Sequence, residues 1–350
     1  MSSASSSRIS AGRNNSFCWP SRAQAYIGAG SEPNQTETGL HPPITIAMAS
    51  YNGARFIRPQ LDSIARQTAT GWRLVVSDDG STDGTRQVVT DFARDCAPGQ
   101  VELIDGPRQG ATRNFLHLTR RADPNGWLAY SDQDDTWLPD RLARGIAFLS
   151  GLSGPAIYAA RTTICDENLT PLTAAPAFPG PFTFRNALIQ ACLPGNTILA
   201  NSAALALLQA AAAAAEAADI VSHDWWAYQV LSGAGAVIKR DTAQVLLYRQ
   251  HPGNVMGRND TARAKAARLS MLFDGSFAGW LARNQRALEP VADLMLPENQ
   301  ALLHRFGEVL SAPGPRALRA VLAMRLYRQT GMGTAAVLAA TLAGRLRSET

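Results

Sequence analysis

The amino-acid sequence predicts an α/β fold, in which a mainly parallel sheet is covered by helices and followed by a helical C-terminal extension. Strand-like and helix-like segments alternate four times between residues 44 and 149, which is typical of parallel strands joined by crossover helices. The first segment, residues 44–49, is a short apolar run, as expected for a strand buried on both faces. From about residue 260 onward the pattern is helical and arginine is frequent.

Each predicted strand in the first half is followed by a predicted helix. The strands are expected at residues 44–49, 73–77, 101–104 and 127–130, and the helices at 55–67, 85–94, 112–122 and 139–149. In a sheet of this kind, ligands bind at the carboxyl ends of the strands. We therefore expect the loops after Ala49, Ser77 and Tyr130 to converge.

Beyond Pro155 the alternation is less regular. Strands are expected at residues 156–163, 196–200, 236–239 and 243–249, and helices at 202–218 and 223–231. Residues 1–42 are rich in Ser, Asn, Gly and Pro and show no periodicity, which is typical of a disordered tail. We therefore divide the chain into a disordered N-terminal tail (1–42), one α/β domain (43–257) and a helical basic extension (258–350).

The composition excludes several classes of protein. The chain has 350 residues, of which 46% are hydrophobic and 17% charged, as in water-soluble globular proteins. No apolar run reaches the ~20 residues of a membrane-spanning helix. The four cysteines are far apart and form no Cys-x-x-Cys pair, so neither a thiolate zinc site nor a disulfide framework is expected. A reducing compartment fits this pattern, and we expect a cytoplasmic protein.

The basic charge is concentrated near the C-terminus. The formal net charge is +5, and residues 310–350 contain six arginines and one glutamate. Basic helices of this kind bind anionic membrane surfaces. At about 100° per residue, however, these arginines point to different sides, which also fits a solvated helix packed on the domain. Both alternatives stay open, and we expect no nucleic-acid partner.

Two acidic clusters stand at the ends of predicted strands, at residues 78–83 and 132–135. Carboxylates crowded this closely raise one another's pKa unless a cation or hydrogen-bond donors compensate. Mg²⁺ or Mn²⁺ would compensate, because these ions bind one or two carboxylates together with substrate phosphates. The alternative is turn chemistry, because Asp-Gly-Ser-Thr-Asp also caps a following helix.

Five segments together carry a resemblance to a known family. They are Ser-Tyr-Asn-Gly at residues 50–53, Val-Val-Ser-Asp-Asp-Gly-Ser-Thr-Asp at 75–83, Tyr-Ser-Asp-Gln-Asp-Asp-Thr-Trp at 130–137, His-Asp-Trp-Trp at 223–226 and Tyr-Arg-Gln-His-Pro-Gly-Asn at 248–254. In this order they resemble the family 2 glycosyltransferases over residues 44–257, in particular the bacterial rhamnosyltransferase-like branch. The resemblance implies a GT-A type αβα sandwich. It also implies a metal-dependent inverting hexosyltransferase for cell-surface polysaccharide synthesis, which moves rhamnose or a similar hexose from a nucleoside diphosphate to a glycan or lipid-linked acceptor.

The same resemblance implies donor-binding roles for several residues. Tyr51 is expected to lie against the nucleobase, and Asp78 or Asp79 to hydrogen-bond the base or the ribose. Asn114, in Gly-Ala-Thr-Arg-Asn at residues 110–114, matches a further family pattern near the donor, although helix capping or solvation explains it equally well. The expected donor is dTDP-rhamnose or a UDP-sugar.

Asp132 and Asp134 match the Asp-x-Asp motif of the family. The resemblance implies that Asp134 binds Mn²⁺ or Mg²⁺ directly and that Asp132 acts through water or the donor ribose. A cation that bridges the diphosphate stabilises the charge that develops as the glycosidic bond breaks. His251 is a further expected ligand by similarity to several relatives, and imidazole suits Mn²⁺ better than Mg²⁺. The alternative for His251 is an ordinary surface or hydrogen-bonded histidine.

Asp224 matches the position of the family's general base, which accepts the proton of the attacking acceptor hydroxyl. The family usually has Glu-Asp here, whereas this chain has His223 before Asp224, so the role of the preceding residue is open. An alternative for Asp224 is the N-cap of the following helix. Trp225 and Trp226 are candidates for stacking on an acceptor sugar, with burial in the core as the alternative.

Other classes of protein fit the sequence less well. A haloacid-dehalogenase phosphatase would need an aspartate where Ser77 stands, and a dinucleotide oxidoreductase would need Gly-x-Gly-x-x-Gly after the first strand. The remaining alternative is a non-catalytic nucleotide-sugar or glycan-binding scaffold of the same fold, against which the presence of Asp224, His251 and both acidic clusters argues. Because acceptors of the family are often lipid-linked, we expect a cytoplasmic enzyme in peripheral contact with the inner face of an anionic membrane.

Overall fold

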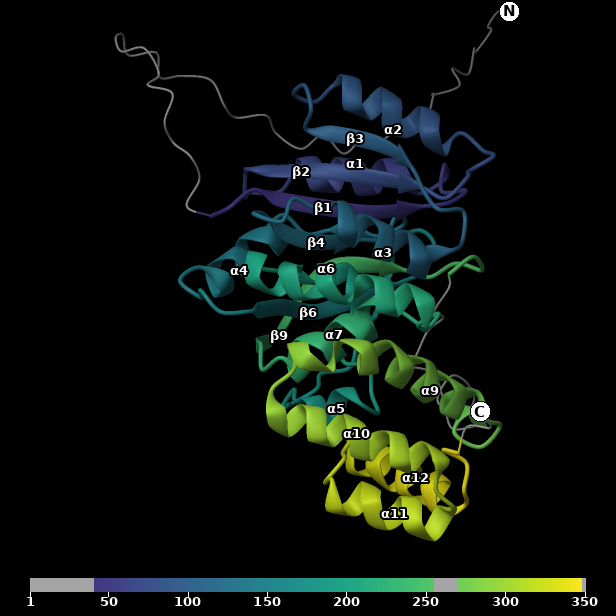
Figure 1. The fold of residues 1–350 in the computed structure, drawn as a ribbon. Helices are drawn as coiled ribbons and strands as arrows, with labels where there is room; N and C mark the ends of the chain where they lie inside the picture. Colours follow the sequence, from purple (N-terminus) through teal and green to yellow (C-terminus); the bar gives the residue numbers. More distant parts are fainter. Residues whose placement is uncertain (1–40, 255–269, 348–350) are drawn as a thin grey trace, which may run out of the picture. The chain divides into compact units, whose positions relative to one another are not determined.

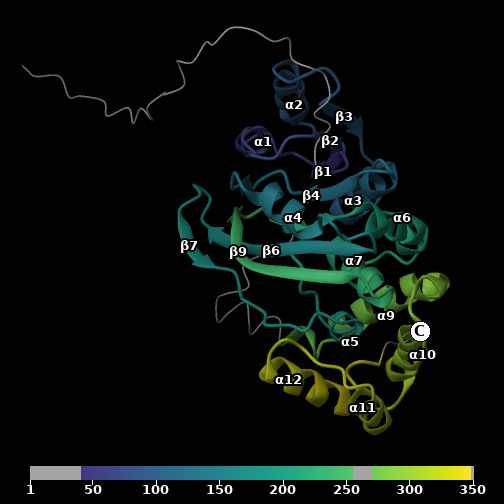
Figure 2. The same ribbon diagram turned by 90° about the vertical axis from the view of Figure 1, so that its left-hand side faces the viewer.

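The computed structural model describes residues 41–254 and 270–347, which are drawn in colour in Figures 1 and 2. Four parallel strands come first along the chain. They are β1 (Ile44–Ser50), β2 (Trp72–Asp78), β3 (Val101–Asp105) and β4 (Trp127–Ser131). β1 pairs in parallel with β2 and with β4, and β2 pairs in parallel with β3. The predicted α/β class with a mainly parallel sheet is therefore confirmed.

The register of these strands brings their carboxyl ends to one edge of the sheet. Ser50 lies opposite Asp78, and Asp78 lies opposite Asp105. On the other side of β1, Met48 lies opposite Ser131 at the end of β4. The loops after β1, β2 and β4 therefore leave the sheet at the same edge, as the sequence predicted.

Both faces of the sheet are covered by helices. On one face α1 (Ile57–Ala65), α2 (Thr85–Arg94) and α4 (Arg141–Leu149) share a hydrophobic cluster with Ile44, Ile46 and Met48 of β1. On the other face α3 (Ala111–Arg121) and α6 (Ser202–Ala217) share a cluster with Ala47 of the same strand. Burial on both faces explains why the sequence of β1 is almost continuously apolar.

The second half of the sheet differs from the prediction in detail. Its strands are β5 (Thr136–Trp137), β6 (Ala156–Cys165), β7 (Pro171–Ala174), β8 (Leu199–Ala200) and β9 (Val237–Arg249). β8 joins β4 to β6 by antiparallel pairing, and β9 runs parallel to β6. β9 is one strand where two were expected, at 236–239 and 243–249. The strand expected at 196–200 is a short 3-10 helix, η1 (Gly195–Thr197), followed by β8.

The described chain after the sheet is helical, as predicted. Its helices are α9 (Ser276–Leu288), η2 (Glu289–Leu294), α10 (Pro297–Ser311), α11 (Gly314–Ala323) and α12 (Gly331–Leu342). They share a hydrophobic cluster with α5 (Phe184–Ala187), α6 and α7 (His223–Gly233), and Figure 2 shows α11 and α12 beside α5. None of the helices in the described residues is long and apolar enough to cross a membrane. Residues 1–40 and the expected boundary at 257 lie outside the described residues, so the division of the chain stays a prediction.

Candidate functional site

The loops after β1 and β4 are joined through the side chain of Gln133. Its Oε1 accepts a hydrogen bond from the backbone N–H of Tyr51 at 3.0 Å, and its Nε2 donates to the Tyr51 carbonyl at 3.0 Å. A Cβ atom on Gly53 would lie 2.0 Å from Gln133 Oε1, so any larger residue at this position would displace the Gln133 amide. The convergence of these loops was predicted, but the role of Gln133 in it was not. The Tyr51 side chain itself is 56% exposed and free to meet a ligand.

The two carboxylates after β2 build the adjacent loops. Asp78 is buried and accepts hydrogen bonds from Ser50 Oγ at 3.2 Å and from Ser81 Oγ at 2.6 Å. Asp79 accepts one from the backbone N–H of Arg108 and one from that of Gly110, both at 2.7 Å. Their oxygens are thus engaged within the protein, and the expected contacts with the donor stay a prediction.

Asn114 is buried and forms a hydrogen bond to the backbone at the end of β2. It is 1% exposed, and its Nδ2 donates to the Ser77 carbonyl at 2.8 Å, which ties α3 to the end of β2. A Cβ atom on Gly106 would lie 3.0 Å from both Asn114 Oδ1 and Asp79 Oδ1. Asn114 is thus a buried amide beside the loop that Asp79 holds, and its expected contact with the donor stays a prediction.

Asp134 and His251 come together from distant parts of the sequence. His251 Nε2 lies 2.8 Å from Asp134 Oδ2, and the two side chains are 12% and 13% exposed. The backbone N–H of Gly253 donates to His251 Nδ1 at 3.1 Å, which places the ring proton on Nε2, facing the carboxylate. The His251 ring is also stacked on Phe56, with the ring centroids 4.5 Å apart. An ion bound between Asp134 and His251 would replace the proton that they now share.

Burial and neighbouring negative charge raise the pKa of two carboxylates in the second acidic cluster. The pKa of Asp132 rises to about 7 because the group is desolvated and because Asp134 and Asp224 add negative charge nearby. The pKa of Asp135 is raised well above its usual range, chiefly by burial, although Asn196 Nδ2 donates to it at 2.6 Å. A cation would relieve this repulsion. Within the described part of the chain, no three acidic, histidine or cysteine side chains form a metal cage, so a bound ion would complete its coordination with phosphate oxygens and water.

Asp224 lies in the first turn of α7, near Asp132 in space. Its Oδ2 accepts a hydrogen bond from the backbone N–H of Gly195 at 3.3 Å, and its Oδ1 from that of Trp225 at 2.7 Å. The N-cap of α7 is Ser222, so the alternative of Asp224 as the N-cap is wrong. The carboxylate is partly exposed and is oriented by two backbone groups.

His223, in the place where the family usually has glutamate, is buried and uncharged. Its ring is stacked on Phe115, with centroids 3.9 Å apart, and meets the Tyr130 ring edge-on at 4.7 Å. Burial lowers the pKa of the imidazole to about 4, against the opposing effect of the Asp224 charge. A Cβ atom on Gly195 would lie 2.7 Å from His223 Nε2, so the ring packs directly under the residue that orients Asp224.

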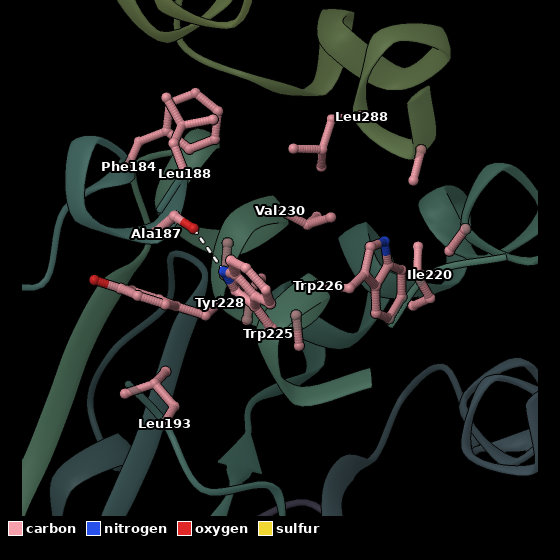
Figure 3. Close-up of a cluster of buried hydrophobic side chains, with 14 of the residues drawn as sticks. Phe184, Ala187, Leu188, Leu193, Ile220, Trp225, Trp226, Tyr228, Val230 and Leu288 are labelled. Atoms are coloured by element: carbon pink, nitrogen blue, oxygen red, sulfur yellow. Dashed lines mark hydrogen bonds between the residues drawn. The ribbon is translucent and has the colours of Figure 1, made fainter. Parts of the chain in front are cut away.

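Trp225 and Trp226 belong to the hydrophobic core, as Figure 3 shows. Trp225 is 4% exposed and Trp226 is completely buried. The indole Nε1 of Trp225 donates to the Ala187 carbonyl at 2.7 Å, which ties α7 to α5. Neither ring offers a face to an acceptor sugar. The expected stacking role is therefore wrong, and the alternative of burial in the core is confirmed.

Two arginines that were not predicted hold the second acidic cluster in place. Arg249 Nε donates to the Asp134 carbonyl at 2.8 Å, and its guanidinium lies 4.8 Å from the centre of the Phe56 ring. Arg141 is buried and donates to the carbonyls of Tyr130 and Asn196 at 2.9 and 2.8 Å. Burial lowers the pKa of Arg141 to about 9. Each arginine binds backbone carbonyls far away in the sequence, and no local pattern indicates such contacts.

Known proteins resemble this chain in sequence and in structure. Residues 45–203 match the family model described as "Glycosyl transferase family 2". The dTDP-rhamnosyl transferase RfbG of Shigella flexneri is 26% identical over 286 residues, which cover 80% of this chain and 96% of that protein. The Escherichia coli UDP-Glc:alpha-D-GlcNAc-diphosphoundecaprenol beta-1,3-glucosyltransferase WfgD is 26% identical over 106 residues, 30% of this chain and 40% of that protein.

Among solved structures, the mannosyltransferase PcManGT of Pyrobaculum calidifontis in complex with GDP-Man and Mn²⁺ has a TM-score of 0.48 and 18% identity, covering 87% of each chain. The family match spans β1 to β4 and both acidic clusters. It agrees with the resemblance that the sequence motifs carry and with the α/β fold observed. Residues 45–203, which include both acidic clusters, are therefore similar to glycosyl transferase family 2.

Proposed function

We propose that this glycosyltransferase is a metal-dependent inverting enzyme that moves rhamnose, or a similar hexose, from a nucleoside diphosphate to a lipid-linked glycan of the cell surface. One observation carries the proposal. The Asp134–His251 pair and the carboxylate of Asp224, which come from three distant parts of the sequence, lie around Asp132 at the carboxyl edge of the parallel sheet. A reaction in which the acceptor hydroxyl displaces the diphosphate in one step needs such an arrangement. It requires a site for the leaving diphosphate and a separate base for the acceptor.

The donor side is assigned to Asp132, Asp134 and His251. A carboxylate and an imidazole form a donor set that suits Mn²⁺ and also admits Mg²⁺. A bound ion would neutralise the diphosphate as the bond to the sugar breaks. The Arg249 side chain holds the backbone of Asp134 in place through its hydrogen bond to the Asp134 carbonyl. Gln133 fastens this loop to that of Tyr51, whose exposed ring is assigned to the nucleobase.

The acceptor side is assigned to Asp224. The acceptor hydroxyl attacks the anomeric carbon, the bond from that carbon to the diphosphate oxygen breaks, and Asp224 takes the hydroxyl proton. A single displacement inverts the configuration and requires no protein nucleophile. The backbone N–H of Gly195 holds one oxygen of Asp224 and so directs the carboxylate.

The nature of the substrates rests on the relatives. RfbG, which aligns along nearly its whole length, is named as a dTDP-rhamnosyl transferase, which supports dTDP-L-rhamnose as the donor. WfgD is named for a UDP-glucose donor and a diphosphoundecaprenol acceptor, so a UDP-hexose is the second candidate donor. Its name also supports a lipid-linked acceptor, and with it peripheral action at the inner face of the cytoplasmic membrane.

A transfer assay tests the proposal. The protein would be incubated with dTDP-L-rhamnose or UDP-glucose and a diphosphate-linked N-acetylglucosamine lipid, with Mn²⁺ or with EDTA. We expect Mn²⁺-dependent transfer from one donor, and a product of inverted anomeric configuration by NMR. Transfer that persists in EDTA would contradict the metal, and a retained configuration would contradict the single displacement. A protein that binds the donor without transfer would favour the non-catalytic scaffold.

A further inference from the structure

The helix α12 presents an apolar face to solvent. Its exposed side chains are those of Met332, Ala335, Ala339 and Leu342. At about 100° per residue these four positions fall within about 80° of one another around the helix. Val337 and Ala340 lie on the inner side and are buried. An ordinary amphipathic helix has one apolar face, which is buried in the core. Helix α12 has a second apolar face, which is exposed to solvent.

The neighbouring helix α11, which packs against α12, also carries an exposed large apolar side chain. A Cβ atom on Gly314, at the start of α11, would lie 2.1 Å from the carbonyl oxygen of Leu342, so the two backbones touch there. Met332 is 86% exposed, Leu322 55% and Leu342 53%. Single exposed apolar residues are ordinary, but a group on two adjoining helices marks an interaction surface.

The charge on α11, α12 and the residues that flank them directly has one sign. Residues 309–348 contain six arginines and no acidic residue. Five of these arginines are exposed, namely Arg316, Arg319, Arg325, Arg345 and Arg347. A second copy of the chain docked on this face by a two-fold axis would set these arginines against their own equivalents. The surface is therefore unsuited to self-association and complementary to an extended anionic one.

We propose that the exposed face of α11 and α12 binds an anionic lipid bilayer. Met332, Leu322 and Leu342 insert among the acyl chains near the headgroups, and the surrounding arginines bind lipid phosphates. On α11, Arg319 lies about 60° from Leu322 around the helix, so its guanidinium can reach the phosphates beside the inserted side chain.

The same helices are connected to the helix that bears Asp224. Between α11 and α12, the hydroxyl of Tyr327 donates to the Pro181 carbonyl at 2.8 Å, and the backbone N–H of Gln329 donates to Gln190 Oε1 at 2.7 Å. The segment around α5 in turn accepts the indole N–H of Trp225. A bilayer bound at α12 would therefore be linked through the segment around α5 to the helix that carries Asp224. The link between the bilayer and the acceptor rests on the proposed lipid-linked acceptor. The proposal that this face binds a bilayer does not depend on it.

Vesicle co-sedimentation of the full chain tests the proposal. We expect binding to vesicles of phosphatidylglycerol and phosphatidylcholine, little binding to phosphatidylcholine alone, and release by high salt. The variant Met332→Asp/Leu342→Asp should weaken binding at least about tenfold, because two charges then enter the apolar face. Arg316→Glu/Arg319→Glu should also weaken binding at least about tenfold, because two cations that meet lipid phosphates are replaced by anions that repel them. The matched control is Leu172→Asp on β7, which changes a side chain that is 46% exposed elsewhere.

Two results would overturn the proposal: failure of the wild-type chain to bind anionic vesicles, or equal binding by the wild type and both double variants. Because Met332 is almost fully exposed, the single variant Met332→Asp should keep the wild-type melting temperature and still bind less. Transfer to a short water-soluble acceptor should be unchanged in these variants. Vesicle binding without any transfer would contradict the proposed function and leave the membrane surface supported.

Discussion

The Nε2 atom of His251 lies 2.8 Å from Oδ2 of Asp134, although 117 residues separate them in the sequence. Both side chains are largely shielded from solvent, and the ring is fixed by Phe56 on its face and by Gly253 at Nδ1. Two groups held this way change little in position when an ion replaces the proton between them.

His251→Ala should therefore raise the Mn²⁺ concentration needed for half-maximal transfer by roughly 10 to 100-fold, since even indirect contributors to metal sites have effects of that size. The measurement is a metal titration of the transfer rate and of Mn²⁺ binding. His304→Ala is the control, because that side chain is 82% exposed on α10. An unchanged titration would leave His251 as an ordinary hydrogen-bonded histidine.

Asp224→Asn should lower the transfer rate by about 10² to 10⁴-fold, the usual contribution of a general base. An asparagine oxygen can still accept the hydrogen bond from Gly195, so we expect the fold and donor affinity to persist. The rate at saturating donor and the dissociation constant of the donor are measured separately. Asp91→Asn serves as the control, because the Asp91 side chain lies on the surface of α2 and is 47% exposed. A near-normal transfer rate would show that Asp224 is not the general base.

Gly53 and Gln133 should show strong coupling in a double-mutant cycle. Alone, Gly53→Ala puts a methyl group where the Gln133 amide now lies, which should cost about 1 to 3 kcal/mol of stability. In a Gln133→Ala background the clash disappears, so the same change should cost little. Urea unfolding of the four proteins measures the coupling. Additive effects would show that the loops after β1 and β4 are not held together by this contact.

How far the sequence predicts the structure depends on whether a residue's contacts are local. The alternation of apolar strands and helices is local, and the carboxyl ends of parallel strands lie at one edge, so the meeting of Tyr51, Asp78 and Asp132 was predictable. The sequence predicted two strands, at 236–239 and 243–249, but β9 continues through the residues between them, where its pairing with β6 shifts register. Two adjacent tryptophans give no indication of which way they face, and both face the core.

Lowering the pH should destabilise the protein through His223. In the folded protein burial lowers the pKa of the imidazole to about 4, from 6.5. As the pH falls below 6.5, the unfolded chain takes up a proton that the folded protein does not. The free energy of unfolding therefore falls through the window from about pH 6.5 to 4, by up to about 3 kcal/mol.

His223→Phe keeps a ring to stack on Phe115 and removes this titration. Urea unfolding between pH 4.5 and 7 should then show a shallower loss of stability than in the wild type. His304→Ala, at its exposed site, should leave the slope as it is. An equal slope in His223→Phe and wild type would mean that other groups cause the acid sensitivity.

The last prediction concerns Asn186, which joins α5, α7 and the C-terminal helices. Its Oδ1 accepts hydrogen bonds from the Tyr228 hydroxyl at 2.9 Å and from Gln329 Nε2 at 3.2 Å, and its Nδ2 donates to the Tyr327 carbonyl at 3.0 Å. Because Asn186 is fully buried, Asn186→Ala removes these three hydrogen bonds, at about 0.5 to 1.5 kcal/mol each, and leaves the Tyr327 carbonyl without its partner, at about 1 to 3 kcal/mol. We expect a loss of at least about 3 kcal/mol in urea unfolding, with Asn168→Ala at an exposed turn as the control. A loss below about 1 kcal/mol, within the range of ordinary surface changes, would mean that the C-terminal helices are held to α7 by apolar packing alone.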